Sequence, residues 1–239
     1  IGPFDFVDAL PHYADQKQSR RLNRRYEAIV APFVDDIRGA SVLDLASHDG
    51  RWAYALSQAG AASVLGIEGR QALIDQFAAY PNDDVKSRVT LRQGDIFDAI
   101  IELVADRATF DVIAAYGIFY HISEQYLLLS LIRRLNPKLV IIDSEFVRDQ
   151  QGPILRFSRE KTDDPLNTID RGAGNVELVA VPTPYLLELM ADTQGFTPHW
   201  VDWNTLPADS RDGVQDYYRT GKARKRRDTV ALRPKPAVS

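Results

Sequence analysis

The chain contains no cysteine, and this absence excludes several kinds of chemistry. Without thiols the protein cannot form a disulfide, a zinc–thiolate site or a thiolate nucleophile. It also lacks long apolar runs, since no stretch approaches the roughly 18 residues that a membrane-spanning helix needs. The N-terminal residues show no basic segment followed by an apolar one. We therefore expect no signal peptide, a cytoplasmic protein and no membrane partner.

The chain also lacks an excess of positive charge. The 239 residues carry 29 lysines and arginines against 33 acids, a formal net charge of -4. A general nucleic-acid binder presents a broad basic surface, so we expect no nucleic-acid partner. One basic run, GKARKRR at 221–227, departs from this pattern, and we interpret it as a solvated turn before the last strand. The expected partner is a small molecule, and a homodimer is compatible with the composition.

Short apolar runs alternate with amphipathic stretches through much of the chain. Apolar residues at helical spacing predict a helix over 17–38. After it we expect strands at 41–47, 63–69, 88–95, 110–117 and 138–146, with helices at 51–60, 71–80, 98–105 and 123–135. The strands are near-continuous apolar runs, which is typical of parallel strands covered on both faces. The sequence therefore predicts an α/β fold with a Rossmann-like, doubly wound sheet.

The last third of the chain has a different pattern. Residues 147–182 are polar and contain several glycines and prolines, so we expect an irregular acceptor lid. Thr183 is placed to cap a following helix, and two closing strands are expected at 199–203 and 228–233. The expected organisation is one domain over 1–239, a helical extension at 1–38 and the lid insertion at 147–182.

Polar residues gather where the predicted strands end, at the edge where open α/β sheets bind ligands. They are the loop Ala46-Ser47-His48-Asp49-Gly50 and the acids Asp44, Glu68, Asp95, Asp143 and Glu145. No lysine or arginine lies inside the first loop, so a phosphate-rich ligand is disfavoured. An acid at the end of the second strand, Glu68, suits the two hydroxyls of a ribose. A ligand with a ribose, no phosphates and a positive charge is expected, and S-adenosylmethionine has these properties.

The motifs resemble those of class I S-adenosylmethionine-dependent methyltransferases, from about residue 38 to 235. VLDLASHDG resembles the first motif of that family, GIEGR the second, GDIF the third and FDVIAAYGIFYHI the fourth. The two closing strands resemble the reversed hairpin that completes a seven-stranded sheet in these enzymes. The first motif departs from the family pattern, because Ala46 and His48 stand where two glycines are usual.

The resemblance implies a binding site for S-adenosylmethionine. Glu68 would hold the ribose beside Gly69, and Asp95 would face the adenine amino group, with Ile96 stacked on the ring. The methionine part would run along Asp44, Ala46, Ser47, Gly50, Tyr116 and Gly117. Structural alternatives stay open for the acids: Asp44 as a buried acid bonded to amides, and Glu68 and Asp95 as solvated strand ends.

Methyl transfer is an in-line displacement in which an acceptor atom attacks the methyl carbon and the sulfur leaves neutral. The protein must align the two molecules and remove a proton from an alcohol acceptor. His121 follows the fourth strand and is the candidate general base, since an imidazole titrates near neutrality. The alternative is a histidine that only packs the turn. Tyr120 and Glu145 complete the catalytic candidates.

Asp143 and Glu145 are also candidate Mg²⁺ ligands, because two acids near His121 could hold an ion that grips a diol. They could instead orient His121, bind a sugar hydroxyl, or form a charged strand end. Aromatic acceptor walls are expected from Tyr13, Phe119, Tyr120, Phe146 and Phe157.

We therefore expect a small-molecule O-methyltransferase that acts on a sugar or mannoside. The chain is similar to bacterial sugar methyltransferases, most narrowly to those that methylate the reducing-end 1-hydroxyl in mycobacterial methylmannose polysaccharide biosynthesis. Three alternatives stay open: an N-methyltransferase with the same cofactor site, a non-catalytic adenosyl-binding module, and an RNA methyltransferase, which the net charge disfavours.

Overall fold

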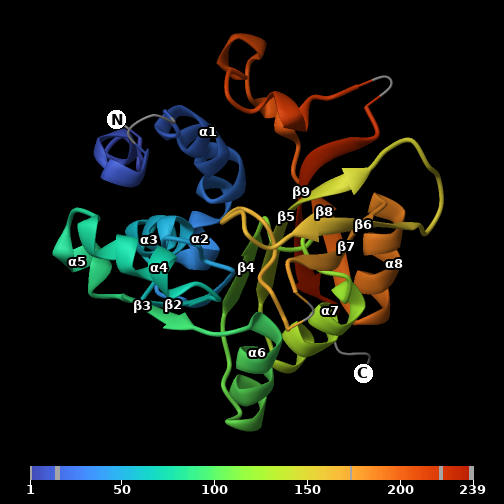
Figure 1. The fold of residues 1–239 in the computed structure, drawn as a ribbon, viewed down its shortest axis with the longest axis horizontal. Coiled ribbons are helices and arrows are strands. Elements are labelled where there is room, and N and C mark those ends of the chain that lie inside the picture. The colour runs from blue at the N-terminus through green and yellow to red at the C-terminus, as the bar shows by residue number, and fades with distance from the viewer. Residues whose placement is uncertain (1, 14–16, 173, 221–222, 237–239) are drawn as a thin grey trace.

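A seven-stranded sheet forms the centre of the molecule, in the order β3-β2-β1-β4-β5-β9-β8 (Figure 1). The computed structural model describes residues 2–13, 17–172, 174–220 and 223–236. The strands are β1 Ser41–Leu45, β2 Ser63–Glu68, β3 Val89–Gln93, β4 Val112–Tyr116, β5 Leu139–Val147, β8 Phe196–Trp200 and β9 Lys225–Pro234. The first five are parallel, and β9 pairs antiparallel with both β5 and β8. The predicted Rossmann-like sheet with a reversed C-terminal pair is confirmed.

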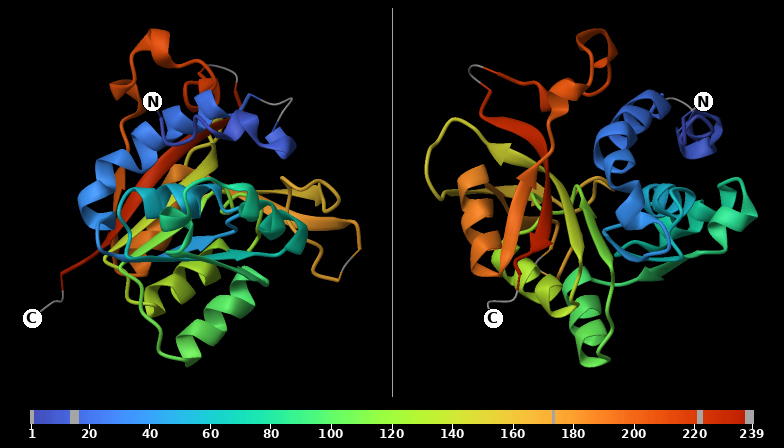
Figure 2. Two further views of the ribbon diagram at one scale, coloured as in Figure 1. Left: turned by 90° about the vertical axis from the view of Figure 1, so that its left-hand side faces the viewer. Right: turned by 180° about the vertical axis from the view of Figure 1, so that it is seen from behind.

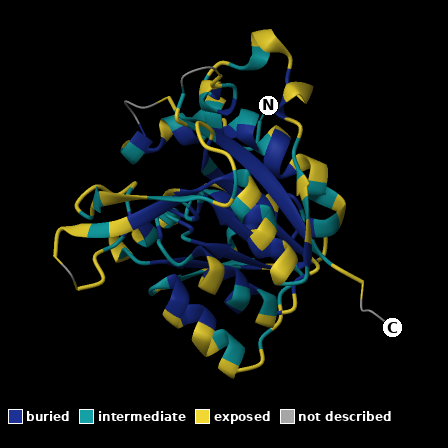
Figure 3. Cartoon of the chain, turned by 90° about the vertical axis from the view of Figure 1, so that its right-hand side faces the viewer, coloured by how far each residue is buried: buried dark blue, intermediate teal, exposed yellow. Residues whose placement is uncertain are grey.

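Helices cover both faces of the sheet, because successive strand residues point to opposite faces and both sets are apolar. On β1, Val42 belongs to the same buried cluster as Trp52, whereas Leu43 belongs to the cluster of Ile100 and Leu128. The helices are α1 Ser19–Ile29, α2 Val34–Ile37, α3 Arg51–Gln58, α4 Gln71–Ile74, α5 Asp83–Lys86, α6 Ile96–Ala105, α7 Gln125–Arg134 and α8 Pro184–Thr193. Figure 3 shows the strands buried between outer helix faces that are largely exposed.

Three local predictions were wrong in detail. The helix expected over 17–38 is broken by a 3-10 turn over Ala31–Phe33, which contains Pro32, since proline cannot donate inside a helix. The helix expected over 71–80 is α4 followed by a 3-10 turn over Asp75–Ala79. Ser123 does not cap α7, whose cap position is Glu124, but Thr183 caps α8 by accepting from the Leu186 amide at 3.2 Å.

The segment 147–182 is not irregular, because it contains two paired strands. They are β6 Leu155–Lys161 and β7 Val176–Pro182, an antiparallel hairpin that projects from the body of the molecule (Figure 2). Much of the hairpin is exposed, so its strands lack the apolar signature of the central sheet, and its connection is far longer than a tight turn. The assignment of this segment as a lid, and of the chain as one domain, stays a prediction.

The basic run at 221–227 leads into β9. Residues 221–222 lie outside the described residues, whereas Lys225, Arg226 and Arg227 begin β9, and Arg227 is only 7% exposed. The interpretation of the whole run as a solvated turn was therefore wrong. Within the described residues, no helix has the length and apolar character needed to cross a bilayer.

Candidate functional site

A cavity of about 570 Å³ lies at the carboxyl ends of the parallel strands. Nine of the predicted site residues line it: Ala46, Glu68, Gly69, Asp95, Ile96, Tyr116, Gly117, Tyr120 and His121. Five do not: Asp44, Ser47, Gly50, Asp143 and Glu145. Predictions from the second, third and fourth motifs thus converge on one cavity.

The loop after β1 adopts the left-handed conformation that glycines would give it. Its φ angles are 56° at Ala46, 55° at His48 and 80° at Gly50. A residue with a side chain is strained at such angles, so the surrounding bonds must hold the loop in place. The His48 amide donates to Glu68 Oε2 at 2.9 Å, and a Cβ at Gly50 would lie 2.5 Å from the Phe77 ring. The loop therefore keeps its shape without two of the usual glycines.

Glu68 is buried against the cavity with both oxygens fixed by backbone donors. Its Oε1 accepts from the Arg70 amide at 2.9 Å, and its Oε2 accepts from His48. Each carboxylate oxygen has a second lone pair that can accept from a ligand, as the predicted ribose contact requires. Glu68 is only 4% exposed, so the alternative of a solvated strand end does not fit.

Replacing Glu68 with alanine is expected to weaken S-adenosylmethionine and S-adenosylhomocysteine alike, because the ribose is common to both. Loss of a charged acceptor should cost roughly 1.5–3 kcal/mol of binding free energy, measured by calorimetry. Glu68→Gln keeps the shape of the side chain and should lose less. Unchanged affinity in a folded Glu68→Ala protein would refute the ribose assignment.

Asp95 has a structural role as well as a place at the cavity. Its Oδ1 caps α6 by accepting from the Phe97 amide at 2.7 Å. Its Oδ2 accepts from Arg171 Nε at 3.1 Å, and the Arg171 guanidinium lies 4.8 Å from the centre of the Phe97 ring. An adenine amino group at Asp95 would therefore meet Arg171, which comes from the β6–β7 connection.

Asp44 lies in β1, fully enclosed, and does not reach the cavity. Among the described residues nothing bonds its Oδ2, and burial raises the pKa of the Asp44 carboxyl to about 8. A carboxyl with a raised pKa is held protonated in the folded protein while the unfolded chain releases its proton near pH 4.

The stability of the protein is therefore expected to fall as pH rises from about 4 to about 8. In this window the native state binds a proton that the unfolded state has lost, so unfolding is favoured by raising the pH. Asp44→Asn should remove this dependence, which denaturation midpoints across the window would reveal. Equal slopes for the parent and the variant would contradict the assignment.

Asp49 links the N-terminal segment to the loop after β1, residues 46–50, which we call the cofactor loop. The sequence did not reveal this link. Its Oδ2 accepts from the Tyr13 hydroxyl at 2.5 Å and the Tyr80 hydroxyl at 3.0 Å, with His12 Nε2 at 3.2 Å. Its Oδ1 accepts from Arg51 Nε at 2.7 Å. His12 and Tyr13 line the cavity through this contact, and no local pattern signals a partner 36 residues away.

His121 pairs with Glu160, which no sequence pattern indicated. His121 Nδ1 lies 2.7 Å from Glu160 Oε2, and that oxygen also accepts from the Thr168 amide at 2.9 Å. Glu160 comes from β6 of the hairpin, 39 positions along the chain. A carboxylate on one ring nitrogen fixes the tautomer and leaves the other nitrogen as an acceptor. A histidine held by an acid in this way can accept a proton on its other nitrogen.

Arg70 holds the connection between β6 and β7 against the carboxyl end of β2, beside Glu68 and Gly69. The Arg70 Nη2 lies 2.9–3.3 Å from four carbonyl oxygens, which its two N–H groups share: those of Thr162, Asp164, Asn167 and Thr168. Ile169 packs on Gly69, where a Cβ would lie 2.7 Å from its side chain. The same loop thus touches the predicted ribose end and, through Thr168, the Glu160–His121 pair.

Hydrogen exchange in residues 162–172 is expected to slow when S-adenosylhomocysteine and acceptor both bind. The loop has few apolar contacts and is held mainly by one side chain, so its bonds should open locally in the free protein. Arg70→Ala should speed exchange there and leave the strands of the central sheet unchanged. Full protection of 162–172 in the free protein would identify a fixed wall instead of a lid.

The metal site predicted at Asp143 and Glu145 is wrong, because cations already neutralise both acids. Asp143 is fully buried, and Arg25 and Arg227 both donate to its Oδ2. Burial alone would raise its pKa, but these two guanidinium groups hold the pKa of Asp143 below its usual value. Within the described residues no group of three or more histidines and acids could hold a metal ion.

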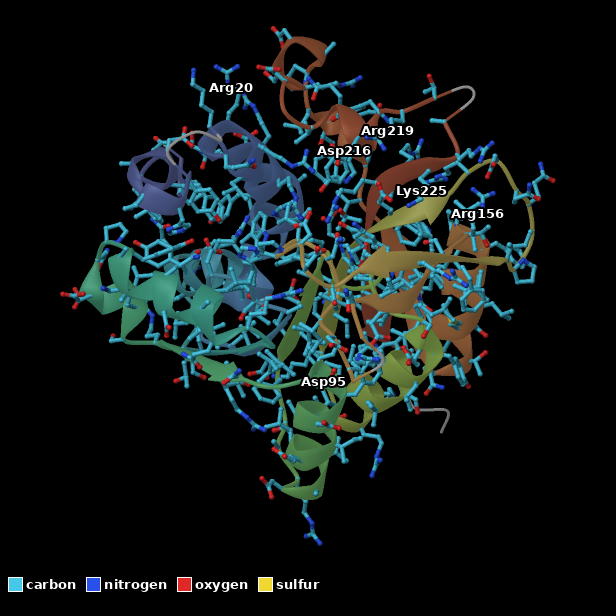
Figure 4. All side chains as sticks on the ribbon, in the orientation of Figure 1. Arg20, Asp95, Arg156, Asp216, Arg219 and Lys225 are labelled. Atoms are coloured by element: carbon cyan, nitrogen blue, oxygen red, sulfur yellow. The ribbon has the colours of Figure 1, made fainter. Side chains whose placement is uncertain are left out.

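Glu145 does not reach the cavity. It lies 3.0 Å from Lys225 Nζ and 3.7 Å from Arg219 Nη1. Figure 4 shows Lys225 and Arg219 near the start of β9, well away from Asp95 at the start of α6. The structure therefore does not bring Glu145 to His121. Phe119, Phe146 and Phe157 are also absent from the lining, so the predicted aromatic walls reduce to Tyr13 and Tyr120.

Comparison with known proteins finds similarity to methyltransferases in the middle of the chain. Residues 42–138 match the family model described as a methyltransferase domain. A tRNA U34 carboxymethyltransferase of Idiomarina loihiensis is 29% identical over 124 residues, 50% of this chain and 35% of that protein. That of Marinobacter nauticus is 31% identical over 121 residues, 50% of this chain and 33% of that protein. The chain thus spans about a third of the length of these relatives.

Solved structures show the same fold at low identity. The N-terminal domain of EvdMO1, solved in the presence of S-adenosylhomocysteine and D-fucose, is 21% identical with a TM-score of 0.59, covering 92% of this chain and 84% of that one. An S-adenosylmethionine-dependent methyltransferase from Listeria monocytogenes is 14% identical with a TM-score of 0.61, covering 92% and 100%. Residues 42–138 thus match a methyltransferase domain, and the chain has the same fold as these S-adenosylmethionine-dependent methyltransferase structures.

Proposed function

We propose that this chain transfers a methyl group from S-adenosylmethionine to a hydroxyl of a small, sugar-like acceptor, with His121 as the general base. The observation that carries the proposal is the His121–Glu160 pair, whose histidine lines the same cavity as Glu68 and Asp95. An alcohol is a poor nucleophile and needs a positioned base, and this pair supplies one.

The chemical step follows from this placement. The acceptor oxygen attacks the methyl carbon, the carbon–sulfur bond breaks, and S-adenosylhomocysteine leaves as a neutral thioether. The hydroxyl proton passes to His121 Nε2, and the Glu160 carboxylate on Nδ1 stabilises the imidazolium that forms. Alignment of donor and acceptor in one cavity supplies the remaining acceleration.

A sugar acceptor is favoured by two observations. Tyr120 presents an aromatic ring at the cavity beside His121, with ring centroids 4.0 Å apart, and such rings pack on apolar sugar faces. The EvdMO1 domain of the same fold was solved with D-fucose present. The mannoside, the position methylated, the amine acceptor and the non-catalytic adenosyl-binding module stay predictions.

Carboxymethyl transfer is the second candidate function. Both curated relatives are carboxymethyltransferases, and a donor whose methyl group carries a carboxylate would need cations near the transferred carbon. Arg25 and Arg227 line the cavity and could supply them. A nucleic-acid acceptor is disfavoured by the net charge of -4.

Comparing the two donors in separate reactions distinguishes methyl transfer from carboxymethyl transfer. The protein would receive methyl-labelled S-adenosylmethionine or its carboxylated analogue, together with a panel of sugars, sugar acids, amines and short RNA. Mass spectrometry should find a methyl group on a sugar oxygen, formed from the uncarboxylated donor. Use of the carboxylated donor alone would establish the second candidate, and label on amines alone would favour N-methylation.

A further inference from the structure

The β9 side of the cavity holds two arginines that share one carboxylate. Asp143 Oδ2 accepts from Arg25 Nη2 at 2.5 Å and from Arg227 Nε at 2.8 Å. Its Oδ1 accepts from the Tyr217 hydroxyl at 2.9 Å and the Thr229 hydroxyl at 2.8 Å. Two guanidinium groups face one carboxylate in this cluster. One positive charge therefore has no counter-charge.

The uncompensated charge is buried. Arg25 and Arg227 are each only 7% exposed, and both line the cavity. Asp216, the acid on the neighbouring 3-10 turn, does not supply the missing charge, because Arg21 holds it with two bonds of 2.9 and 2.7 Å. Burying a cation without a partner is costly, so a site of this kind is completed by an anion.

Each arginine also has a terminal nitrogen with no protein acceptor. Within the described ranges, no hydrogen bond is made by Arg25 Nη1 or by Arg227 Nη2. Arg227 Nη2 lies 3.3 Å from where a Cβ would stand at Gly117, so a side chain at that position would crowd the guanidinium. Because both residues are nine-tenths buried and line the cavity, these donors can serve only a ligand or water within it.

We propose that Arg25 and Arg227 form an anion subsite that binds a carboxylate or phosphate group of the acceptor. This inference rests on the proposed function and narrows its acceptor to a negatively charged molecule, such as a sugar acid or a sugar phosphate. Arg227 Nη1 donates to the Tyr120 hydroxyl at 3.1 Å, which places the subsite next to His121. In the sheet, β9 lies three strands from β1, about 14 Å at the usual strand spacing. The subsite thus adjoins His121 through Tyr120 and borders the predicted methionine end at Gly117, and we assign it to the acceptor.

Calorimetry on protein saturated with S-adenosylhomocysteine tests the subsite directly. Inorganic phosphate and acetate, each compared with chloride at equal ionic strength, should show saturable binding by at least one of the two oxyanions. Arg227→Gln should weaken that binding about 10–100-fold, the usual worth of a charged hydrogen bond. Arg226→Gln is the matched control, because Arg226 is the preceding residue of β9 and pairs with Asp228; it should bind like the parent.

A variant that binds the anion more tightly provides a test that misfolding cannot imitate, since a misfolded protein would lose binding. Asp143→Asn leaves both cations without their carboxylate and should bind the same anion more tightly than the parent. A parent protein that does not distinguish phosphate or acetate from chloride would overturn the proposal, and so would an Arg227→Gln protein that binds as tightly as Arg226→Gln.

A second comparison distinguishes the acceptor from the donor as the source of the anion. S-adenosylhomocysteine carries a carboxylate, whereas 5′-methylthioadenosine lacks the whole amino-acid part. Arg25→Gln and Arg227→Gln should leave the affinity for both unchanged. Loss of S-adenosylhomocysteine affinity alone would assign the arginines to the cofactor and overturn the proposal. None of these binding experiments depends on turnover. Absence of anion binding would therefore disprove the subsite without disproving methyl transfer, and absence of methyl transfer would not disprove anion binding.

Discussion

Replacing His121 with alanine is expected to slow methyl transfer about 10²–10⁴-fold, the usual worth of a positioned general base. Affinity for S-adenosylhomocysteine should hardly change, because the imidazole is bound to Glu160 on the β6 side of the cavity and not to the predicted cofactor acids. Single-turnover rates with saturating cofactor would measure the loss. A base also makes the rate of the parent enzyme depend on pH, and His121→Ala should lose that dependence.

Two further variants separate catalysis from structure. Glu160→Gln keeps the size of the side chain but removes the charge on Nδ1, so its rate should fall less and its pH profile should move. His199→Ala alters an exposed histidine on β8 outside the cavity lining and should behave like the parent. A folded His121→Ala protein with parental turnover would remove the base from the mechanism and favour an amine acceptor.

Asp49→Ala is expected to lower the free energy of unfolding by roughly 3–5 kcal/mol, the cost of breaking a buried ion pair from one side. Asp49 is completely buried, and its removal leaves the Arg51 guanidinium and the hydroxyls of Tyr13 and Tyr80 without their acceptor. Urea denaturation at neutral pH would measure the loss. The N-terminal residues 4–13 should also exchange faster, because their link to the cofactor loop is cut.

The same carboxylate makes stability depend on acid. Burial alone would raise the pKa of Asp49, but Arg51, with hydrogen bonds from His12 and His48, holds it well below its usual value. A lowered pKa contributes stability that is present above about pH 4 and is lost as the pH falls further. Asp212→Ala, which removes an exposed partner of Arg20, is the control and should not change the midpoint measurably. A parental unfolding midpoint for Asp49→Ala would contradict this account.

The central sheet, and the cavity residues at the carboxyl ends of its strands, could be predicted because short stretches of sequence indicate them. Apolar runs marked the strands that helices cover on both faces. Glu68 is the last residue of β2, and Asp95 follows β3 as the cap of α6. The order of strands brings such ends together, so a list of strand-end residues already described one wall of the cavity.

The part of the cavity around His121 and Arg227 could not be predicted in the same way, because its contacts join residues that are distant in the sequence. Glu160 meets His121 through a hairpin whose exposed strands carry little apolar pattern. Arg227 looked like part of a solvated basic run, yet β9 carries it to Asp143, 84 positions away. Asp143 itself was misread as a metal ligand, since nothing near it in sequence shows the two arginines that neutralise it.

Transfer of a ¹³C-labelled methyl group from S-adenosylmethionine to sugar acceptors, followed by NMR, tests the central claim most directly. The carbon shift of the transferred methyl distinguishes a methyl ether from a methyl amine, so it reports the acceptor atom itself. The account predicts a new methyl ether signal with the parent enzyme and almost none with His121→Ala over the same time. A label found only on nitrogen, or an ether formed equally fast by both proteins, would contradict it.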